Sequence, residues 1–171
     1  MAARPSTSVR KRKPKPPTVI GCAEHIALPE LGLLALEAKV DTGAQTTAIH
    51  ATAVRTKEID GRRWVSFRVP LRGAKPVQCH ARLRGVKLVK NTGGKPERRF
   101  FIRTRLHIGE RSWPIDVTLA NRRNMKFAVI LGRAAILHRR VLVDPDGQHL
   151  QGEPTLPASP SPDPLLEGTD P

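Results

Sequence analysis

The sequence predicts a single, mainly β domain with one short helix and a tail at each end. Between residues 18 and 150 the apolar residues recur with a period of two rather than 3.6, which is typical of half-buried strands. Turn signals such as Asp60-Gly61 separate these stretches at short intervals. A chain of 171 residues accommodates one domain of ordinary size together with tails.

Both ends of the chain differ in composition from the middle and are predicted to be disordered. Residues 1–17 hold six lysines and arginines, four prolines and no acid, whereas residues 151–171 hold six prolines and only acidic charges. Such segments bury too little apolar surface to offset the entropy lost on ordering. The expected domains are therefore a basic tail over 1–17, a folded domain over 18–150 and a Pro-rich acidic tail over 151–171.

The first half of the domain is expected to carry a strand into an Asp-Thr-Gly turn. A strand is predicted over 18–24 and a second over 34–40, where apolar residues alternate with others. This second strand leads directly into Asp41-Thr42-Gly43. An extended pattern resumes over 46–59, and Asp60-Gly61 then predicts a hairpin to a strand that faces Phe67 toward the core.

The second half is expected to form a long hairpin and then a buried strand. Residues 78–90 are predicted to pair with 99–108, with Gly85 as a bulge and the Gly-rich segment 91–96 as the tip of the hairpin. The remaining predicted elements are a strand over 113–119, a continuous apolar strand over 127–131 that ends at Gly132, a helix of one or two turns over 133–138, and a strand over 141–143.

The folded part of the chain is strongly basic. Of the formal net charge of +15, the tails contribute +6 and −4, which leaves +13 for residues 18–150. A domain this positive attracts acidic partners in a salt-dependent way. Nucleic acid, ribosomal surfaces and polyglutamate-like peptides all qualify, and charge alone does not choose among them. The run Arg10-Lys11-Arg12-Lys13 is a nucleic-acid contact, an import signal or simply a solvated terminus.

Cysteine content and hydropathy favour a cytoplasmic protein. Cys22 and Cys79 are too few for a disulfide framework, so buried thiols in a reducing compartment are expected. The basic N-terminus runs into prolines instead of an apolar leader segment, and no stretch approaches the ~20 apolar residues of a membrane span. No Gly-x-x-x-x-Gly-Lys-Ser/Thr loop for a nucleotide is present.

The Asp-Thr-Gly segment is the main candidate for chemistry. A preceding apolar strand would hold the Asp41 carboxylate, Gly43 would permit a tight turn, and Thr42 would hydrogen-bond the backbone or a partner motif. The alternative is a structural turn closed by an Asx-type hydrogen bond, which is common for such a tripeptide. Small residues follow the motif directly, beginning with Ala44.

Two separated segments together resemble a known family. Val40-Asp41-Thr42-Gly43-Ala44 and Val129-Ile130-Leu131-Gly132-Arg133 resemble the retropepsins, in which the active-site strand packs against a strand-Gly-Arg-helix element. More closely, residues 39–51, 118–133 and 143–145 are similar to blocks of the bacterial and archaeal proteins labelled ATP-dependent zinc protease. That family is often associated with ATP-grasp glutamate ligases.

The resemblance implies a closed acid-protease β-barrel and an aspartic peptidase. By position it makes Asp41, Thr42 and Gly43 the catalytic segment, with Ala44, Gly132 and Arg133 as its structural support. Because two neighbouring carboxylates must share one proton in this chemistry, and the chain holds one such motif, a homodimer that pairs two copies of Asp41 is expected. Within one chain, Asp116 and Asp144 are the alternative partners, although a structural role is favoured for each.

The zinc label of the family has no counterpart in the motifs of this chain. There is no His-Glu-x-x-His, and Cys79-His80 would point to opposite faces of a strand. Cys22, His25, His50, His107 and His138 are scattered singly, so neither a metal nor another cofactor is expected. A zinc site assembled from distant residues stays open as an alternative.

Two functions from different classes follow. The first is a peptidase that hydrolyses an acidic, glutamate-rich protein substrate through an Asp41 dyad, with a functional link to a glutamate ligase. The second is a noncatalytic basic module that binds an acidic protein, the ribosome or RNA. Only Trp64 and Trp113 are tryptophans and tyrosine is absent, which weighs against RNA binding by stacking. No membrane partner is expected.

Overall fold

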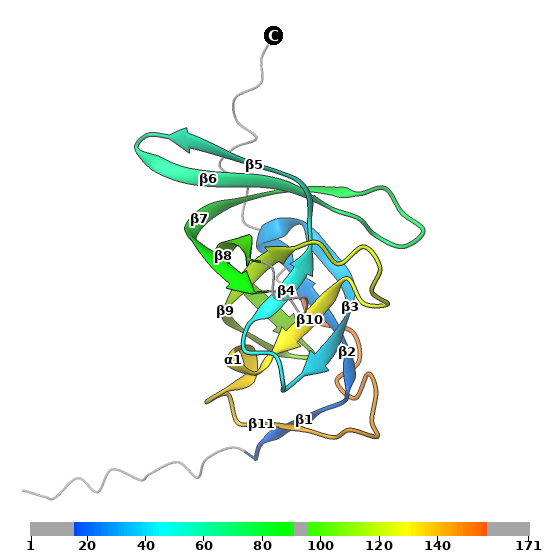
Figure 1. Ribbon diagram of the computed structural model, residues 1–171. Coiled ribbons are helices and arrows are strands. Elements are labelled where there is room, and N and C mark those ends of the chain that lie inside the picture. The colour runs from blue at the N-terminus through cyan, green and yellow to red at the C-terminus, as the bar shows by residue number, and fades with distance from the viewer. Residues whose placement is uncertain (1–15, 91–95, 157–171) are drawn as a thin grey trace, which may run out of the picture.

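The structure is a computed structural model that describes residues 16–90 and 96–156. Its centre is a closed barrel, shown in Figure 1, that consists of six strands. One continuous sheet has the strand order β2-β3-β10-β4-β9-β8-β7-β6-β5. An additional pairing of β2 with β8, through Ala27 and His107, closes the first six of these strands into the barrel. The predicted mainly β acid-protease barrel with one short helix is confirmed.

The barrel contains both parallel and antiparallel pairs. Its strands are β2 (Ala23–Leu28), β3 (Leu33–Asp41), β10 (Val129–Gly132), β4 (Thr47–His50), β9 (Arg111–Ala120) and β8 (Pro96–Ile108). Strand β10 lies between β3 and β4, parallel to the first and antiparallel to the second. Its residues are buried or half-buried on both faces of the sheet, which explains why the sequence reads as a continuous apolar run.

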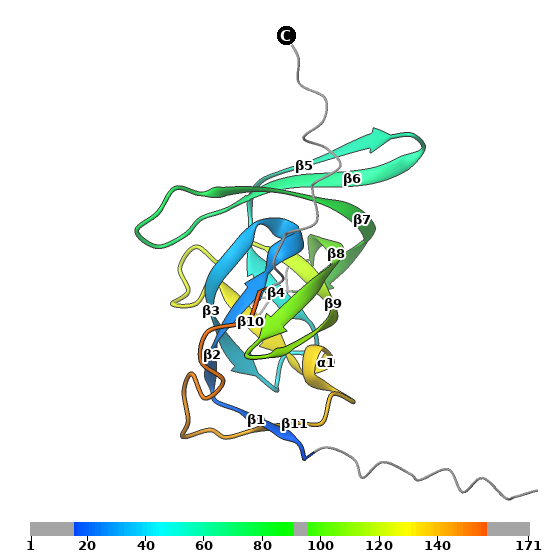
Figure 2. The same ribbon diagram turned by 180° about the vertical axis from the view of Figure 1, so that it is seen from behind.

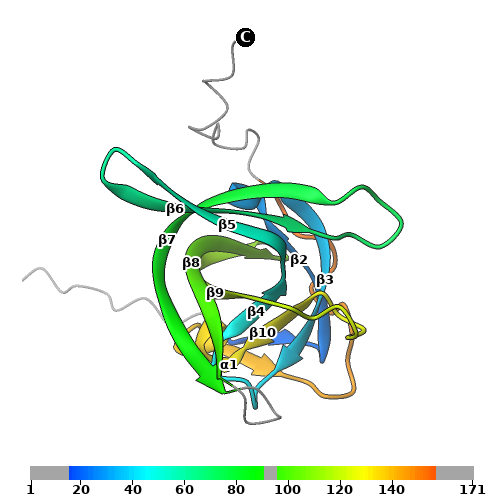
Figure 3. The same ribbon diagram turned by 45° about the horizontal axis from the view of Figure 1, so that its top comes forward.

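Three further strands leave the barrel as a ribbon. Strand β7 (Val77–Lys90) pairs with β8 in its second half and with β6 (Arg62–Val69) in its first half, and β5 (Thr52–Ile59) forms the outer edge. Figure 3 shows this ribbon arching across the top of the barrel. Asp60 and Gly61 both have positive φ angles, 50° and 69°, as expected of the hairpin turn between β5 and β6.

Most of the predicted elements are present, with local corrections. The single strand expected over 18–24 is divided into β1 (Thr18–Ile20) and β2, and a 3₁₀ turn, η1 (Pro29–Leu31), precedes β3. The predicted bulge at Gly85 is confirmed by a register shift between Leu83 and Gly85. Leu34 and Leu88 are exposed at 47% and 73%, so neither belongs to the core that the alternation suggested. The tip 91–95 lies outside the described residues.

A small second sheet lies at the opposite end from the ribbon. Strand β1 pairs in parallel with β11 (Val141–Val143), which follows the helix α1 (Arg133–Ile136) (Figures 1 and 2). The side chain of Glu24 is fully buried beside this sheet and accepts hydrogen bonds from three backbone amides, those of Gly21 (2.6 Å), Leu150 (3.0 Å) and Gln151 (3.3 Å). Glu24 therefore fastens the end of the folded chain to β2.

The folded part extends beyond the boundary predicted at residue 150. Thr155 donates its backbone N–H to Gly109 (2.8 Å), and its carbonyl oxygen lies 3.0 Å from Nδ1 of His107. Glu153 forms an ion pair with His25. These contacts involve residues 153 and 155, which the composition places in the acidic tail. Composition alone does not show that a coil packs against the folded domain. Among the described residues, no helix has the length and apolarity needed to cross a membrane.

Candidate active site

The candidate catalytic segment begins at the last residue of β3. Leu36, Ala38 and Val40 point into the core and are buried, so the alternating residue Asp41 points away from it and is half-buried. Asp41 is the register partner of Gly132 at the end of the parallel strand β10. The two ends of parallel strands thus bring together the two segments that lie far apart in the sequence.

The turn after β3 is closed by the Asp41 side chain itself. Its Oδ1 accepts hydrogen bonds from the backbone N–H groups of Gly43 and Ala44, both at 3.1 Å, and Ala44 N–H also lies 3.2 Å from the Asp41 carbonyl oxygen. Within the described residues Oδ2 has no hydrogen-bond partner. One carboxylate oxygen is therefore fixed by the backbone, and the other is available for a proton or a water molecule.

Close packing at Gly132 supports this turn. A Cβ atom at Gly132 would lie 2.4 Å from the backbone carbon of Thr46, a distance that real side chains do not tolerate. Its N–H donates to Oγ1 of Thr47 (3.2 Å), and Oγ1 of Thr118 donates to the Thr47 carbonyl (3.0 Å). Glycine at this position permits β10 to cross directly against the chain that follows the Asp-Thr-Gly turn.

Arg133 binds the same loop from the start of α1. Its backbone N–H donates to the Ala44 carbonyl at 2.9 Å, and its guanidinium donates to the Gly43 carbonyl (3.3 Å) and to Oε1 of Gln45. Ala44 is therefore held on both sides, through its N–H by Asp41 and through its carbonyl by Arg133. Thr42 is exposed at the tip of the turn.

The two alternative carboxylates lie in other surroundings. Asp116 on β9 forms an exposed ion pair with Arg103 on β8, with Oδ1 2.9 Å from Nε. Asp144 follows β11 and its Oδ1 accepts the backbone N–H of Asp146 at 3.0 Å. Each carboxylate has a structural partner of its own, and no contact joins either of them to Asp41 in the described part of the chain.

Two arginines near the site were not among the predicted site residues, although Arg122 lies within the block 118–133 that resembles the family. The pKa of Arg122 is lowered by burial and by the nearby charge of Arg99, whereas the carboxylate of Asp41 raises it. These three groups therefore act on one another electrostatically. Arg122 bonds the Phe127 carbonyl through Nε (3.4 Å), and its backbone N–H bonds Nδ1 of His50 (3.0 Å). In the described residues the terminal nitrogens of Arg122 have no partner. Arg99 forms an ion pair with Glu97 through Nη2 (3.3 Å), while its buried Nε has no partner.

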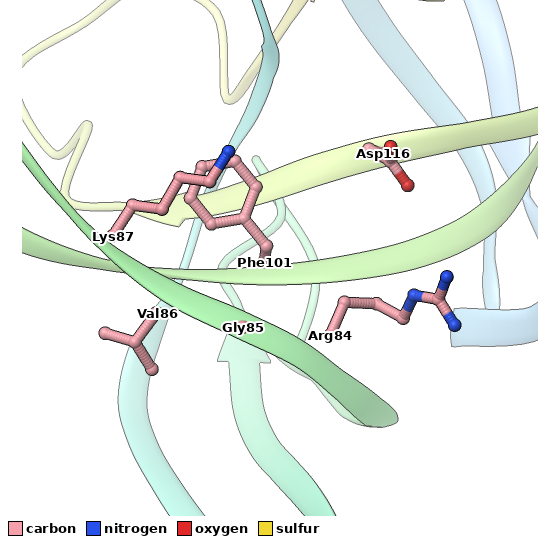
Figure 4. Close-up of a pocket in the computed structure, with 6 residues that line it drawn as sticks. All are labelled: Arg84, Gly85, Val86, Lys87, Phe101 and Asp116. Atoms are coloured by element: carbon pink, nitrogen blue, oxygen red, sulfur yellow. The ribbon is translucent and has the colours of Figure 1, made fainter.

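A shallow pocket of about 230 Å³ lies over β7, β8 and β9, on the outer face of the sheet toward which Asp41 also points. In Figure 4 the ammonium group of Lys87 lies over the ring of Phe101, 4.9 Å from its centroid, and Arg84 extends toward the side of Asp116. Register partners connect this pocket to the catalytic strand, because one row crosses the sheet from β8 to β3 through Phe101, Thr118, Ala48, Ile130 and Lys39. Lys39 lies two residues before Asp41.

The cysteine and histidine side chains provide no metal site in the part of the chain that the structure describes. Within residues 16–90 and 96–156, no three His, Cys, Asp or Glu side chains form a group that would hold a metal ion. Cys22 and Cys79 are both free thiols. Burial raises the pKa of Cys79 to about 12, so this thiol is not a nucleophile at neutral pH. His25 and His149 meet edge to face and are paired with Glu153 and Glu37 respectively.

Comparisons with known proteins agree with this geometry. Two curated relatives, described as probable alpha-L-glutamate ligases of Desulfotalea psychrophila and Parasynechococcus marenigrum, are each 42% identical over 138 residues, or 79% of this chain. The match covers only 30% and 29% of those proteins, so the chain spans less than a third of their length. The crystal structure of Lpg0085 from Legionella pneumophila, a protein of unknown function, has a TM-score of 0.69 and 27% identity over 78% of this chain and 98% of that one.

A family model identifies the fold more specifically. The model described as retropepsin-like aspartic endopeptidase RimB matches residues 19–154, which include every element of the barrel and the whole Asp41 turn. The match also reaches the docked coil that follows residue 150. The chain therefore belongs to the RimB-like family of retropepsin-like aspartic endopeptidases.

Proposed function

We propose that the protein is an aspartic peptidase in which two copies of Asp41 form the catalytic dyad and cleave an acidic protein substrate. The observation that carries this proposal is the state of the Asp41 carboxylate, with Oδ1 held by two backbone N–H groups and Oδ2 without a partner in the described residues. A structural Asx turn needs only the first of these features. A carboxylate with one fixed and one unoccupied oxygen is suited to hold and polarise water.

The chemistry needs a second carboxylate close to the first. Two carboxylates a few ångströms apart do not both ionise, so one retains a proton while the other polarises a water molecule. The ionised carboxylate takes a proton from that water as its oxygen attacks the substrate carbonyl, while the protonated carboxyl gives its proton to the carbonyl oxygen. When the C–N bond breaks, the leaving nitrogen receives the proton taken from the water, and the former carbonyl oxygen returns its proton to the pair. Asp116 and Asp144 are engaged elsewhere, so the second copy of Asp41 from a homodimer is the partner that we propose.

The small sheet β1–β11 is the surface that we propose for dimerisation. Its two strands have unpaired edges, which are templates for strands of another chain. Val19 and Leu142 are register partners on it, exposed at 41% and 56%. This surface adjoins the catalytic strand, because Val40 donates its N–H to the Cys22 carbonyl at 2.9 Å. A two-fold axis near β1 would therefore bring the two copies of Asp41 toward each other.

The charges around Asp41 support an acidic substrate. Arg122, Arg99 and Lys39 place positive charge beside the scissile position, and Glu97 offsets part of it through an ion pair with Arg99 (3.3 Å). The terminal nitrogens of Arg122 have no partner in the described chain and are suited to donate to a substrate carboxylate.

The relatives give a reason to test glutamate. Proteins described as probable alpha-L-glutamate ligases contain a segment 42% identical to this chain within a much longer polypeptide. A ligase of that name forms bonds to glutamate, and a peptidase cleaves such bonds. We therefore propose glutamate-rich segments as the substrate class, acted on in functional association with a ligase of this kind.

The deciding experiment compares Asp41→Asn with the unchanged protein on a carrier protein that ends in a run of glutamates. Cleavage, followed by mass spectrometry, is expected to fall by at least about a thousandfold, because the amide neither ionises nor shares a proton. Asp116→Asn is the matched control, since it makes the same change in an exposed ion pair. It is expected to keep most of the activity.

Sedimentation in the same buffer measures the expected homodimer, and Leu142→Glu is expected to shift it toward monomer with loss of activity. Equal cleavage by the Asp41→Asn variant would refute the peptidase proposal and leave a noncatalytic binding module.

A further inference from the structure

The ribbon that leaves the barrel has two faces of opposite character. Val65, Phe67 and Cys79 point toward the core and are almost fully buried. Their neighbours in sequence point the other way and form what we name the outer ribbon face. Its members are Thr52, Arg55, Lys57, Ile59, Arg62, Trp64, Ser66, Arg68, Gln78, His80 and Arg82.

All the charges on the outer ribbon face are positive. Its five cations are exposed, and four of them are arginines. The acids of the ribbon lie elsewhere, since Glu58 is the register partner of Arg63 on the opposite face and Asp60 lies in the hairpin turn. Within the described residues no ion pair neutralises any of the five, and Arg68 bonds only the neutral Gln78 (3.3 Å).

An aromatic ring lies in the middle of these cations. Trp64 is the register partner of Lys57 on β5 and of Arg82 on β7, so one cross-strand row reads cation, indole, cation. The other tryptophan, Trp113, is 5% exposed and donates to the Ala135 carbonyl at 2.7 Å. Trp64 is half-buried, so of the two tryptophans it is the one with ring surface left for a partner, and it lies between two of the cations.

We propose that the outer ribbon face binds single-stranded RNA, a function separate from peptide cleavage. The arginines match phosphate oxygens by paired hydrogen bonds, and the indole of Trp64 supplies a flat surface on which an unpaired base stacks. A run of glutamates would satisfy the charges but has no aromatic ring to place on Trp64. Folded RNA presents unpaired bases in loops, whereas the bases of duplex DNA are stacked inside the helix.

The face is distant from Asp41 in space. The ribbon lies at one end of the barrel, whereas β3 ends near the opposite end, where β1 and β11 lie (Figure 1). RNA binding is therefore expected to survive Asp41→Asn unchanged, and that variant separates failure of this proposal from failure of the peptidase proposal.

The test is fluorescence anisotropy of a labelled, mixed-sequence single-stranded RNA titrated with the full chain over a range of salt concentrations. The triple variant Lys57→Gln, Arg68→Gln, Arg82→Gln is expected to weaken binding by at least about tenfold. It should also reduce the slope of log K against log salt by about 2, since each phosphate contact on a single strand contributes roughly 0.7. Trp64→Leu is expected to cost about tenfold in affinity with the slope unchanged.

A second triple variant, Arg63→Gln, Arg98→Gln, Arg105→Gln, removes the same charge from exposed arginines off this face. It is expected to change affinity by less than about threefold. Equal losses in the two triple variants would overturn the proposal, because binding would then follow net charge alone. Tighter binding of a polyglutamate peptide that is insensitive to Trp64→Leu would assign the face to an acidic polypeptide instead, and preference for single-stranded DNA of the same sequence would also refute the RNA assignment.

Discussion

The two ends of the sheet are built on different principles. At the Asp41 end, backbone groups from β3, β10 and the loop 42–46 lie in direct contact, and few side chains separate them. At the ribbon end, an ordinary alternation places apolar residues on one face and cations on the other. The close contact at the Asp41 end leaves no room for one added atom at Gly132, whereas the alternation of the ribbon can be met by many different sequences.

This difference concerns tolerance to change as well as geometry. A close backbone crossing has no room for an added methyl group, because packed interiors do not relax freely around it. Substitutions on an exposed sheet face change the free energy of unfolding little, so their main effect is on binding. Chemistry that needs fixed carboxylates belongs in the first setting, and recognition of a polyanion belongs in the second.

The largest stability effect is expected at the crossing. Gly132→Ala places a Cβ atom against the Thr46 backbone and is expected to cost at least about 3 kcal/mol in the free energy of unfolding. Gly85→Ala on β7 is the matched control, because a Cβ there meets nothing within 4 Å. Urea denaturation measures both. A small loss for Gly132→Ala would show that the crossing yields and would erase the contrast with the ribbon.

A smaller effect is expected at the buried carboxylate that fastens the folded chain's end. Glu24→Gln keeps the shape of the side chain but turns an N–H₂ group toward backbone donors, so about 2 kcal/mol is expected to be lost. Hydrogen exchange at Leu150 and Gln151 should accelerate more than exchange in β7. Glu58→Gln, an exposed change on β5, is the comparison and is expected to leave exchange at those two amides nearly unchanged. Unaltered exchange in both variants would contradict the anchoring role of Glu24.

The smallest effect is expected in the ribbon. Gly61→Ala meets no neighbouring atom within 4 Å, and its cost arises only from the positive φ angle of 69°, about 1 kcal/mol. Thermal denaturation by circular dichroism measures the shift, and Gly61→Asn is the control because asparagine tolerates this conformation better. A cost as large as that of Gly132→Ala would mean that the hairpin is as tightly constrained as the site.

Local pattern was sufficient to predict much of the barrel. Alternation located β3 and β6, Asp60-Gly61 predicted the hairpin turn, and the apolar run before Gly132 predicted a buried strand. Each of these signals comes from a few consecutive residues. Leu34 and Leu88 were misplaced because apolar character alone does not say which side of a strand meets the core.

The surroundings of Asp41 were only partly predictable. The backbone turn at 41–44 and the neighbouring Gly132 and Arg133 follow from motifs that the chain spells out. Their relation to Arg99 and Arg122 does not, since an arginine in a basic sequence carries no sign of its spatial neighbours, even though Arg122 lies in a block that resembles the family. Glu24 was missed for the same reason, because its three donors come from residues 21, 150 and 151.

By itself the sequence determined the strand periodicity, the turns, the Asp-Thr-Gly segment and the excess of positive charge. Tertiary structure alone decided that β2 meets β8 to close the barrel, that Arg99 and Arg122 share the field of Asp41, and that five cations surround Trp64 on one face. The physical reason is the distance along the sequence over which each effect acts. Periodicity and turn preference act between residues a few positions apart, whereas closure, burial and electrostatic neighbourhood depend on which distant strands come to lie 5 Å apart, about the usual spacing in a sheet.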